Sequence, residues 1–277
     1  MSAKVWIDGR FHDKLDARVS AFDHGVLFGD GVTAAMRIYS GHPFRLAAYI
    51  DRLFRAASDI ALSIPGTPAE LREVVLKTVG ENRRTEGFVR ILVTRGAGTL
   101  SLDPRKCDPC VVVIAEDVVP YPRELYDSGL DVVVVPTTRP PLHSLDQGPL
   151  VRAKVAALKV GCLDAILCDA SGAISGATDA AVFAAIDGAL HTPPIENGPD
   201  PETAQFVQSL ASEIGLQFHE RPISKGELRP ASELFLAGQS GEVIAVRSVD
   251  GQPIGSGGEG PTTRRLRTLY RDAVRRL

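Results

Sequence analysis

The 277-residue chain is 44% hydrophobic and 23% charged, with a formal net charge of −3. This composition predicts one large domain or two medium ones with a real core, and its charge excludes nucleic acid and anionic membranes as expected partners. The opening residues, MSAKVWIDGRF, lack the apolar run of a signal peptide, and the longest apolar stretches are strand-sized. We therefore expect a cytoplasmic protein.

Short predicted strands are interleaved with helices, which indicates an α/β protein with two lobes. We predict an N-terminal α+β domain over 1–118, a proline-bearing linker over 119–129 and a C-terminal α/β domain over 130–277. The predicted strands are Val5–Ile7, Phe88–Arg95, Val111–Ala115, Leu130–Val135, Ala165–Asp169, Ala180–Ile186 and Glu233–Leu236. The predicted helices are Phe44–Ser63, a helix from Thr67 or Pro68 to Val79, Leu150–Val160, Pro201–Ile214 and Thr262–Leu277.

Cys107 and Cys110 form a C-x-x-C spacing within a proline-bearing loop. This spacing is compatible with half of a zinc site or with a redox pair, but a zinc site needs a second pair of ligands. No suitably spaced His or Cys pair is evident elsewhere in the sequence. We interpret the spacing as incidental and predict no metal site.

Several motifs occur in a fixed order along most of the chain. They are the segment Asp23–Val32 (DHGVLFGDGV), Arg52-Leu53, Val93–Gly96 (VTRG), Gly161–Asp169 (GCLDAILCD), His191–Pro194 (HTPP) and Gly260–Leu266 (GPTTRRL). Together they resemble the class IV, or fold-type IV, pyridoxal-phosphate (PLP) enzymes, which include branched-chain and D-amino-acid aminotransferases and aminodeoxychorismate lyase. The resemblance implies the two-domain fold-type IV aminotransferase-like fold and a homodimer with Phe22–Val32 near its two-fold axis.

The resemblance places His143 where the family carries its Schiff-base lysine. An ungapped alignment overlays 143–172 on the lysine-bearing segment and the helix after it. A gapped alternative brings Lys154 to the lysine position, but it deletes about two helical turns. Because an imidazole cannot form an imine, the usual chemistry requires Lys154 or the nearby Lys159, both of which we interpret as solvated helix residues.

Other cofactor positions implied by the resemblance also differ from the family pattern. Gly176 stands where the family has the glutamate that pairs with the pyridine nitrogen, and Asp179 is the nearest substitute. Pro201-Glu202-Thr203 replaces a G-I-T turn that holds phosphate at a helix N-terminus. We predict that Asp200, Pro201 and Glu202 instead cap this helix themselves.

The remaining implied site residues lie on three further segments. A second phosphate loop corresponds to Ala237, Gly238 and Gln239, with Ser240 as the nearest hydroxyl, and Arg52 matches a helix arginine that reaches the phosphate. Val32-Thr33-Ala34 replaces a V-(F/Y)-E segment that borders the substrate. We therefore assign Thr33 and Arg95 as candidate substrate contacts, with ordinary ion pairing as the alternative for Arg95.

Three functions are compatible with these residues. The first is a homologue without PLP that binds another small molecule in the cleft between the domains, with His143 as an acid or base or as a remnant. The second is an active PLP-dependent aminotransferase or lyase with atypical cofactor binding. The third is a non-catalytic interaction partner, in a heterodimer with a genuine relative. We favour the first.

Overall fold

The computed structural model describes residues 3–196 and 198–277, which divide into two compact units. Of the described residues, unit 1 comprises 3–118, 141–147 and Leu277, and unit 2 comprises 119–140, 148–196 and 198–276. Unit 1 thus ends its main segment at Val118. The expected linker 119–129 belongs to unit 2 and contains a helix, Arg123–Ser128, which ends at Gly129.

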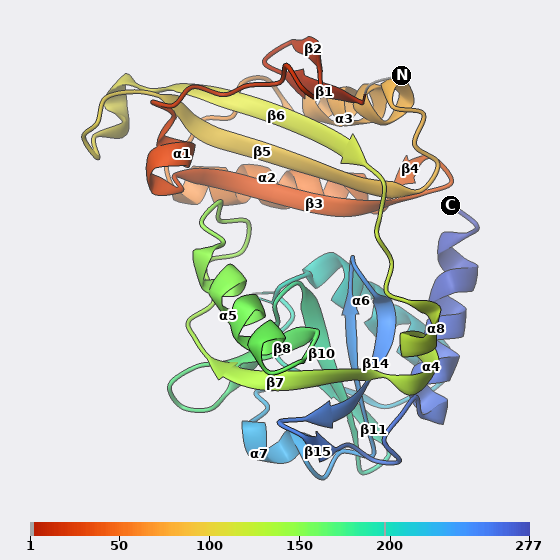
Figure 1. Cartoon of the computed structure of the whole chain (residues 1–277). Helices are drawn as coiled ribbons and strands as arrows, with labels where there is room; N and C mark the ends of the chain where they lie inside the picture. The colour runs from red at the N-terminus through yellow and green to blue at the C-terminus, as the bar shows by residue number, and fades with distance from the viewer. Residues whose placement is uncertain (1–2, 197) are drawn as a thin grey trace. The chain divides into compact units, whose positions relative to one another are not determined.

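Within the described residues, unit 1 contains a six-stranded sheet in the order β2-β1-β6-β5-β3-β4. Helices α2 and α3 pack on this sheet and on each other (Figure 1). The elements of unit 1 are β1 (Lys4–Ile7), β2 (Arg10–Asp13), α1 (His24–Phe28), β3 (Gly31–Tyr39), β4 (His42–Pro43), α2 (Leu46–Asp59), α3 (Pro68–Glu81), β5 (Gly87–Ala97), the 3-10 helix η1 (Pro104–Lys106) and β6 (Asp108–Glu116).

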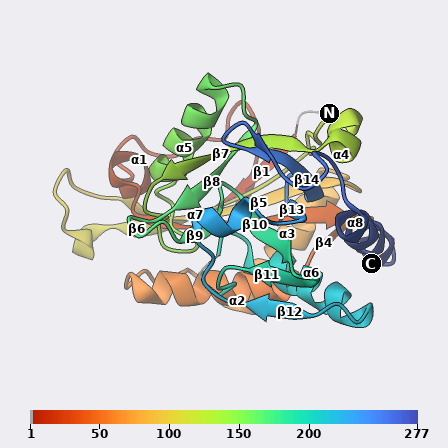
Figure 2. The same cartoon turned by 90° about the horizontal axis from the view of Figure 1, so that it is seen from below.

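The sheet of unit 2 has nine strands in the described residues, and its path is β12-β11-β10-β13-β14-β7-β8-β9 with β15 paired to β14. Helix α5 packs on β7 and β8, whereas α6 and α8 pack on β13 (Figure 2). The elements are α4 (Arg123–Ser128), β7 (Leu130–Pro136), α5 (Gly148–Lys159), β8 (Asp164–Cys168), β9 (Ile174–Ala177), β10 (Ala180–Ile186), β11 (Ala189–Thr192), α6 (Pro201–Glu213), β12 (Phe218–Glu220), α7 (Lys225–Leu228), β13 (Glu233–Gly238), β14 (Glu242–Val249), β15 (Gln252–Pro253) and α8 (Pro261–Val274).

Strand β7 shows how the alternation of side chains divides unit 2 into two cores. Leu130, Val132 and Val134 point into a core shared with β10, β13 and β14. Val133 and Val135 point the other way and pack against the small-residue face of α5. This alternation has the period of two that a strand imposes.

The predicted helix Phe44–Ser63 is shorter than expected at both ends. The chain turns at Arg45, and α2 ends in a Schellman motif in which Leu62 N–H donates to Ala57 O and Ala61 N–H donates to Ser58 O. Ala61 takes the left-handed conformation, with φ of 50°, that glycine usually supplies. The helix therefore ends at Asp59, four residues before the predicted end at Ser63.

Candidate active site

The motif Asp23–Val32 forms α1 and the N-terminal end of β3 in unit 1. Asp23 caps α1 by accepting a hydrogen bond from Gly25 N (2.7 Å) and accepts another from the Thr94 hydroxyl (2.7 Å). At Gly31 a Cβ atom would lie 2.4 Å from Val93 O, so only glycine allows β3 and β5 to approach this closely. The motif therefore fixes the start of β3, which carries Thr33.

His143 lies against this same end of β3. The segment 141–147 pairs with it through a hydrogen bond from Thr33 N to His143 O (2.7 Å) and one from Leu145 N to Gly31 O (3.0 Å). His143 has a left-handed backbone, with φ of 64°, and its Nδ1 lies 2.8 Å from Thr33 O. Because a carbonyl oxygen only accepts, Nδ1 carries the proton and the lone pair of the neutral ring is on Nε2.

The three other candidates in unit 1 have different surroundings. The Thr33 hydroxyl is buried and donates to Ile91 O (2.9 Å). Arg95 forms a bidentate ion pair with Asp30, at 2.9 and 3.0 Å, and donates to Ile60 O and Ala61 O at 2.8 Å each. Arg52 lies among the buried residues of α2.

The contacts of Arg95 favour ordinary ion pairing, the alternative to a substrate contact that the sequence left open. Its guanidinium joins the motif residue Asp30 to the C-terminal end of α2, and its side chain is only 9% exposed. Thr33 likewise uses its hydroxyl for a hydrogen bond within the sheet.

In unit 2, no side chain fits at Gly176 in this backbone arrangement. Its φ is +118°, and a Cβ atom would lie 2.6 Å from Pro199 Cδ and 3.3 Å from Arg139 Nη2. Arg139 donates a hydrogen bond to Ala177 O, next to Gly176. The position that the resemblance assigns to a carboxylate therefore adjoins the guanidinium of Arg139, which no sequence motif marks.

Burial lowers the pKa of Arg139 to about 10, and the charges of Asp179 and Asp164 oppose this shift. The guanidinium consequently stays protonated at neutral pH. A cation here would repel a protonated pyridine ring, which is the form that the family glutamate stabilises.

Helix α6 is capped by its own residues, as predicted. Asp200 Oδ1 accepts a hydrogen bond from Thr203 N (3.3 Å), Pro201 occupies the first turn, and Glu202 is the acidic residue of that turn. Asp200 and Glu202 are 1% and 2% exposed. Two buried carboxyl groups therefore lie at the helix end where the resemblance implies a phosphate, and their charge disfavours an added anion.

We expect Asp200→Ala to lower the free energy of unfolding by about 1 kcal/mol, because it removes the N-cap acceptor of α6. Added phosphate should not raise the melting temperature of the native protein. The double variant Pro201→Gly/Glu202→Ile should gain stabilisation by phosphate, since it opens an N–H group and removes a competing charge. Thermal melting with and without phosphate checks this. Strong stabilisation of the native protein and none of the double variant would contradict the self-capping of α6.

The loop that corresponds to the second phosphate segment also forms a hydrogen bond with another residue of unit 2. Ser240 donates its hydroxyl hydrogen to Asp179 Oδ2, and a Cβ atom at Gly238 would lie 2.6 Å from Asp179 O. The cavity beside Gly238 and Ser240, and the cavity beside Gly176 and Asp200, hold about 10 Å³ each. Each has room for about one water molecule.

The two lysines that could replace the Schiff-base lysine lie on α5. Lys154 Nζ is 3.7 Å from Asp164 Oδ1, which also accepts from the Thr178 hydroxyl. Burial, followed by the charge of Asp179, raises the pKa of Asp164, and Lys154 opposes that shift. Lys159 is exposed at the end of the helix. The geometry assigns Lys154 to a pair with a buried carboxyl group of β8.

The thiols of Cys107 and Cys110 are not activated. Cys107 Sγ lies 3.6 Å from His24 Nε2, and burial raises its pKa. Burial and the neighbouring Asp8 raise the pKa of Cys110 to about 12. Among the described residues, no group of three or more metal-ligating side chains is found. Both thiols therefore stay protonated at neutral pH, which disfavours redox exchange.

The fold and these motifs define a class. The model of the family described as "Amino-transferase class IV" matches residues 31–249, and the chain belongs to this family. It is 36% identical to a putative branched-chain-amino-acid aminotransferase of Methanocaldococcus jannaschii, over 97% of this chain and 96% of the relative. It is 31% identical to the D-alanine aminotransferase of Bacillus licheniformis, over 98% and 97% of the two chains.

Solved structures agree with this family. The chain matches the branched-chain amino acid aminotransferase of Escherichia coli with a TM-score of 0.91 and 26% identity, covering 98% of this chain and 94% of that one. A second branched-chain amino acid aminotransferase (from T.th.), solved with pyridoxamine 5'-phosphate, matches with a TM-score of 0.91 and 26% identity over 99% and 94% of the chains. The two-domain fold-type IV aminotransferase-like fold is thus confirmed.

Proposed function

We propose that this class IV aminotransferase homologue has lost PLP-dependent catalysis and binds a different small molecule. The observation that carries the proposal is the environment of Gly176, where a proline ring and a cationic guanidinium fill the space that a carboxylate side chain would need. The self-capped end of α6 and the pairing of Ser240 with Asp179 support it. These residues do not fit a pyridine ring and a phosphate group.

His143 is the candidate acid or base of this proposed function. The hydrogen bond to Thr33 O holds the ring and selects the tautomer with a basic Nε2. Its left-handed backbone costs free energy, and such strain is common at functional positions. With Nε2 as the accepting nitrogen, His143 can take a proton from a ligand and return it.

The alternative is an active PLP-dependent aminotransferase with atypical cofactor binding. It is favoured by the names of the relatives, which include branched-chain and D-alanine aminotransferases. This alternative requires a lysine that leaves its ion-pair partner and reaches the cofactor. In unit 2, Lys154 and Lys225 form ion pairs with Asp164 and Asp250, which argues against this alternative.

We also propose a homodimer, in which the partner covers an apolar patch of unit 1. The patch contains exposed side chains just before and within α1 and in the loop that leads to η1: Phe22, Val26, Phe28, Leu100 and Leu102. The two segments lie side by side, because Gly98 N donates to Phe22 O and His24 Nε2 lies 2.8 Å from Thr99 O. Exposed patches of this kind mark interfaces.

In the part of the chain that the structure describes, no helix is long and apolar enough to span a membrane.

Native mass spectrometry of the purified protein tests these proposals together. We expect the mass of two chains, with no mass increment of PLP after incubation with it. Any co-purified increment should be a different small molecule. A monomer at micromolar concentration contradicts the dimer, and a stoichiometric PLP adduct contradicts the loss of the cofactor. The cytoplasmic location remains a prediction.

A further inference from the structure

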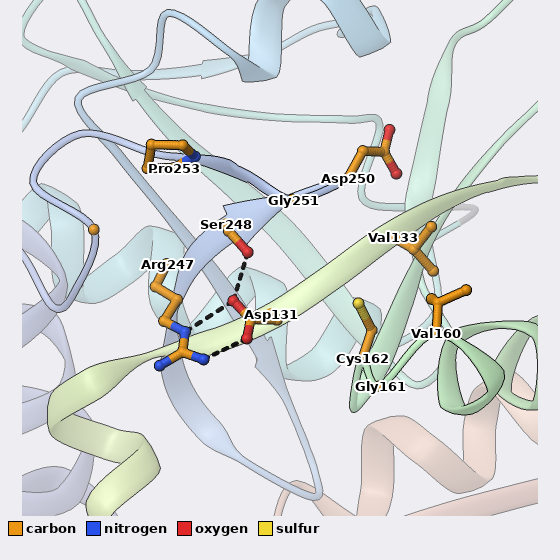
Figure 3. Close-up of a pocket in the computed structure, with 11 residues that line it drawn as sticks. Asp131, Val133, Val160, Gly161, Cys162, Arg247, Ser248, Asp250, Gly251 and Pro253 are labelled. Atoms are coloured by element: carbon orange, nitrogen blue, oxygen red, sulfur yellow. Dashed lines mark hydrogen bonds and ion pairs between the residues drawn. The ribbon is translucent and has the colours of Figure 1, made fainter.

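A cavity of about 670 Å³ opens on unit 2, and neither Gly176, Asp200 nor Ser240 lines it. Its volume lies within the range of small-molecule sites. It is lined by Asp131 and Val133 of β7, by Val160, Gly161 and Cys162 after α5, by Arg247 and Ser248 of β14, and by Asp250, Gly251, Pro253 and Gly257 around β15. Figure 3 shows Arg247 and Ser248 beside Asp131, with Val133, Val160 and Cys162 on the other side of Asp131 and Asp250 apart from this group.

A β-bulge builds the polar side of this cavity. β14 pairs with β7 through Val246 opposite Leu130 and Ser248 opposite Asp131, so Arg247 is an extra residue in the ladder. Bulges redirect side chains in this way. As a result Arg247 and Ser248 both reach Asp131: Arg247 Nε donates to Oδ1 (2.8 Å), Arg247 Nη2 donates to Oδ2, and Ser248 Oγ donates to Oδ1.

The charged groups of the cavity are compensated by one another. Asp131 pairs with Arg247, and the hydrogen bonds from Arg247 hold the pKa of Asp131 below its usual range. Asp250 accepts from Val134 N (2.8 Å) and pairs with Lys225 Nζ (2.7 Å). Each charged side chain of the cavity thus already has a partner of opposite charge. The cavity therefore favours an uncharged ligand over a cation or an anion.

Two hydrogen-bonding groups remain side by side. Arg247 Nη2 donates one of its two N–H hydrogens to Asp131 Oδ2, which leaves its second N–H next to that oxygen, and the side chain is 44% exposed. Oδ2 of Asp131 accepts one hydrogen bond, from Arg247, and retains a second lone pair. The pair thus offers donors and an acceptor at one edge of a cavity whose other walls include Val133, Val160 and Pro253.

We propose that this cavity binds an uncharged cyclic amide or imide. The ring carbonyl would accept from Arg247, the adjacent ring N–H would donate to Asp131, and the ring faces would contact the apolar walls. The site lies wholly within unit 2 and does not involve His143, which belongs to unit 1. It is therefore independent of the function proposed above.

Saturation-transfer NMR with uracil as the probe tests this site on the full-length protein. We expect uracil to bind, and 1,3-dimethyluracil, which lacks the N–H donors, to bind at least about tenfold more weakly. Benzoate, an anion, and benzylamine, a cation, test whether the cavity prefers a charged ligand. Failure of uracil to bind, equal binding of the methylated ring, or tighter binding of either charged probe overturns the proposal.

Variants locate the binding. Arg247→Met should weaken uracil binding at least about tenfold, and Val160→Trp should block the cavity mouth. Val151→Trp is the matched control, because Val151 is similarly exposed on α5 but does not line the cavity. Native-like uracil binding by folded Arg247→Met or Val160→Trp overturns the site. If either variant fails to fold, amide shifts of the native protein decide: shifts outside the lining residues overturn it.

Discussion

Replacing Gly176 by Glu should destabilise the protein by about 3 kcal/mol or more, rather than restore a carboxylate to the site. The new side chain would meet two costs. Its backbone would have to keep a φ of +118°, which strains residues other than glycine by about 1–3 kcal/mol. Its Cβ would lie 2.6 Å from Pro199 Cδ, and such overpacking typically costs about 1–3 kcal/mol.

The matched control is Gly172→Ala. Gly172 has a φ of +83°, but a Cβ atom there meets nothing within 4 Å. It should therefore show the backbone strain alone, about 1 kcal/mol. Chemical denaturation of both variants measures the difference. If Gly176→Glu is as stable as Gly172→Ala, then Pro199 and Arg139 yield easily, and the space at this position is not closed to a carboxylate.

The second large effect concerns Arg95. We expect Arg95→Met to lower the free energy of unfolding by about 3 kcal/mol, because it leaves Asp30 without its counter-ion and two carbonyl groups at the end of α2 without donors. Any ligand of the native protein should bind the folded variant with unchanged affinity. Denaturation curves and a binding titration at a temperature where the variant is folded measure the two quantities.

Arg72→Met is the control for Arg95. Arg72 pairs with Asp51 on the surface, where the two side chains are 36% and 55% exposed. Such pairs contribute about 0–1 kcal/mol. A small loss of stability for Arg95→Met, combined with a loss of ligand binding, would instead return Arg95 to the role of a substrate contact.

The sequence was sufficient where local chemistry decides the structure. Asp200, Pro201 and Glu202 predict the start of α6 because a side-chain acceptor, a fixed φ and an acidic first turn act within a few residues. The strand Leu130–Val135 was predictable from its apolar run, and the class of fold from the order of the motifs. Each of these signals lies within one short segment.

The candidate site was harder to predict from the sequence, because its residues are far apart in the chain and come together only in the fold. Arg139 lies in a proline-rich loop, and nothing in that loop indicates that it reaches Ala177. Arg95 and Asp30 are far apart in sequence, so only the pairing of β3 with β5 brings them together. The sequence also does not indicate that the segment 141–147 belongs to unit 1. This segment follows unit 2 residues in the chain but pairs with β3. The bulge at Arg247 leaves no mark in the residue pattern.

We expect that this homologue does not carry PLP on a lysine. The most direct measurement is the visible spectrum of the purified protein with added PLP, followed by borohydride reduction, proteolysis and peptide mass spectrometry. We predict a colourless protein, the spectrum of free PLP after addition, and no pyridoxyl-lysine peptide above the level given by denatured protein. A yellow protein with a stoichiometric pyridoxyl adduct on a peptide that contains Lys154 or Lys159 would contradict the account.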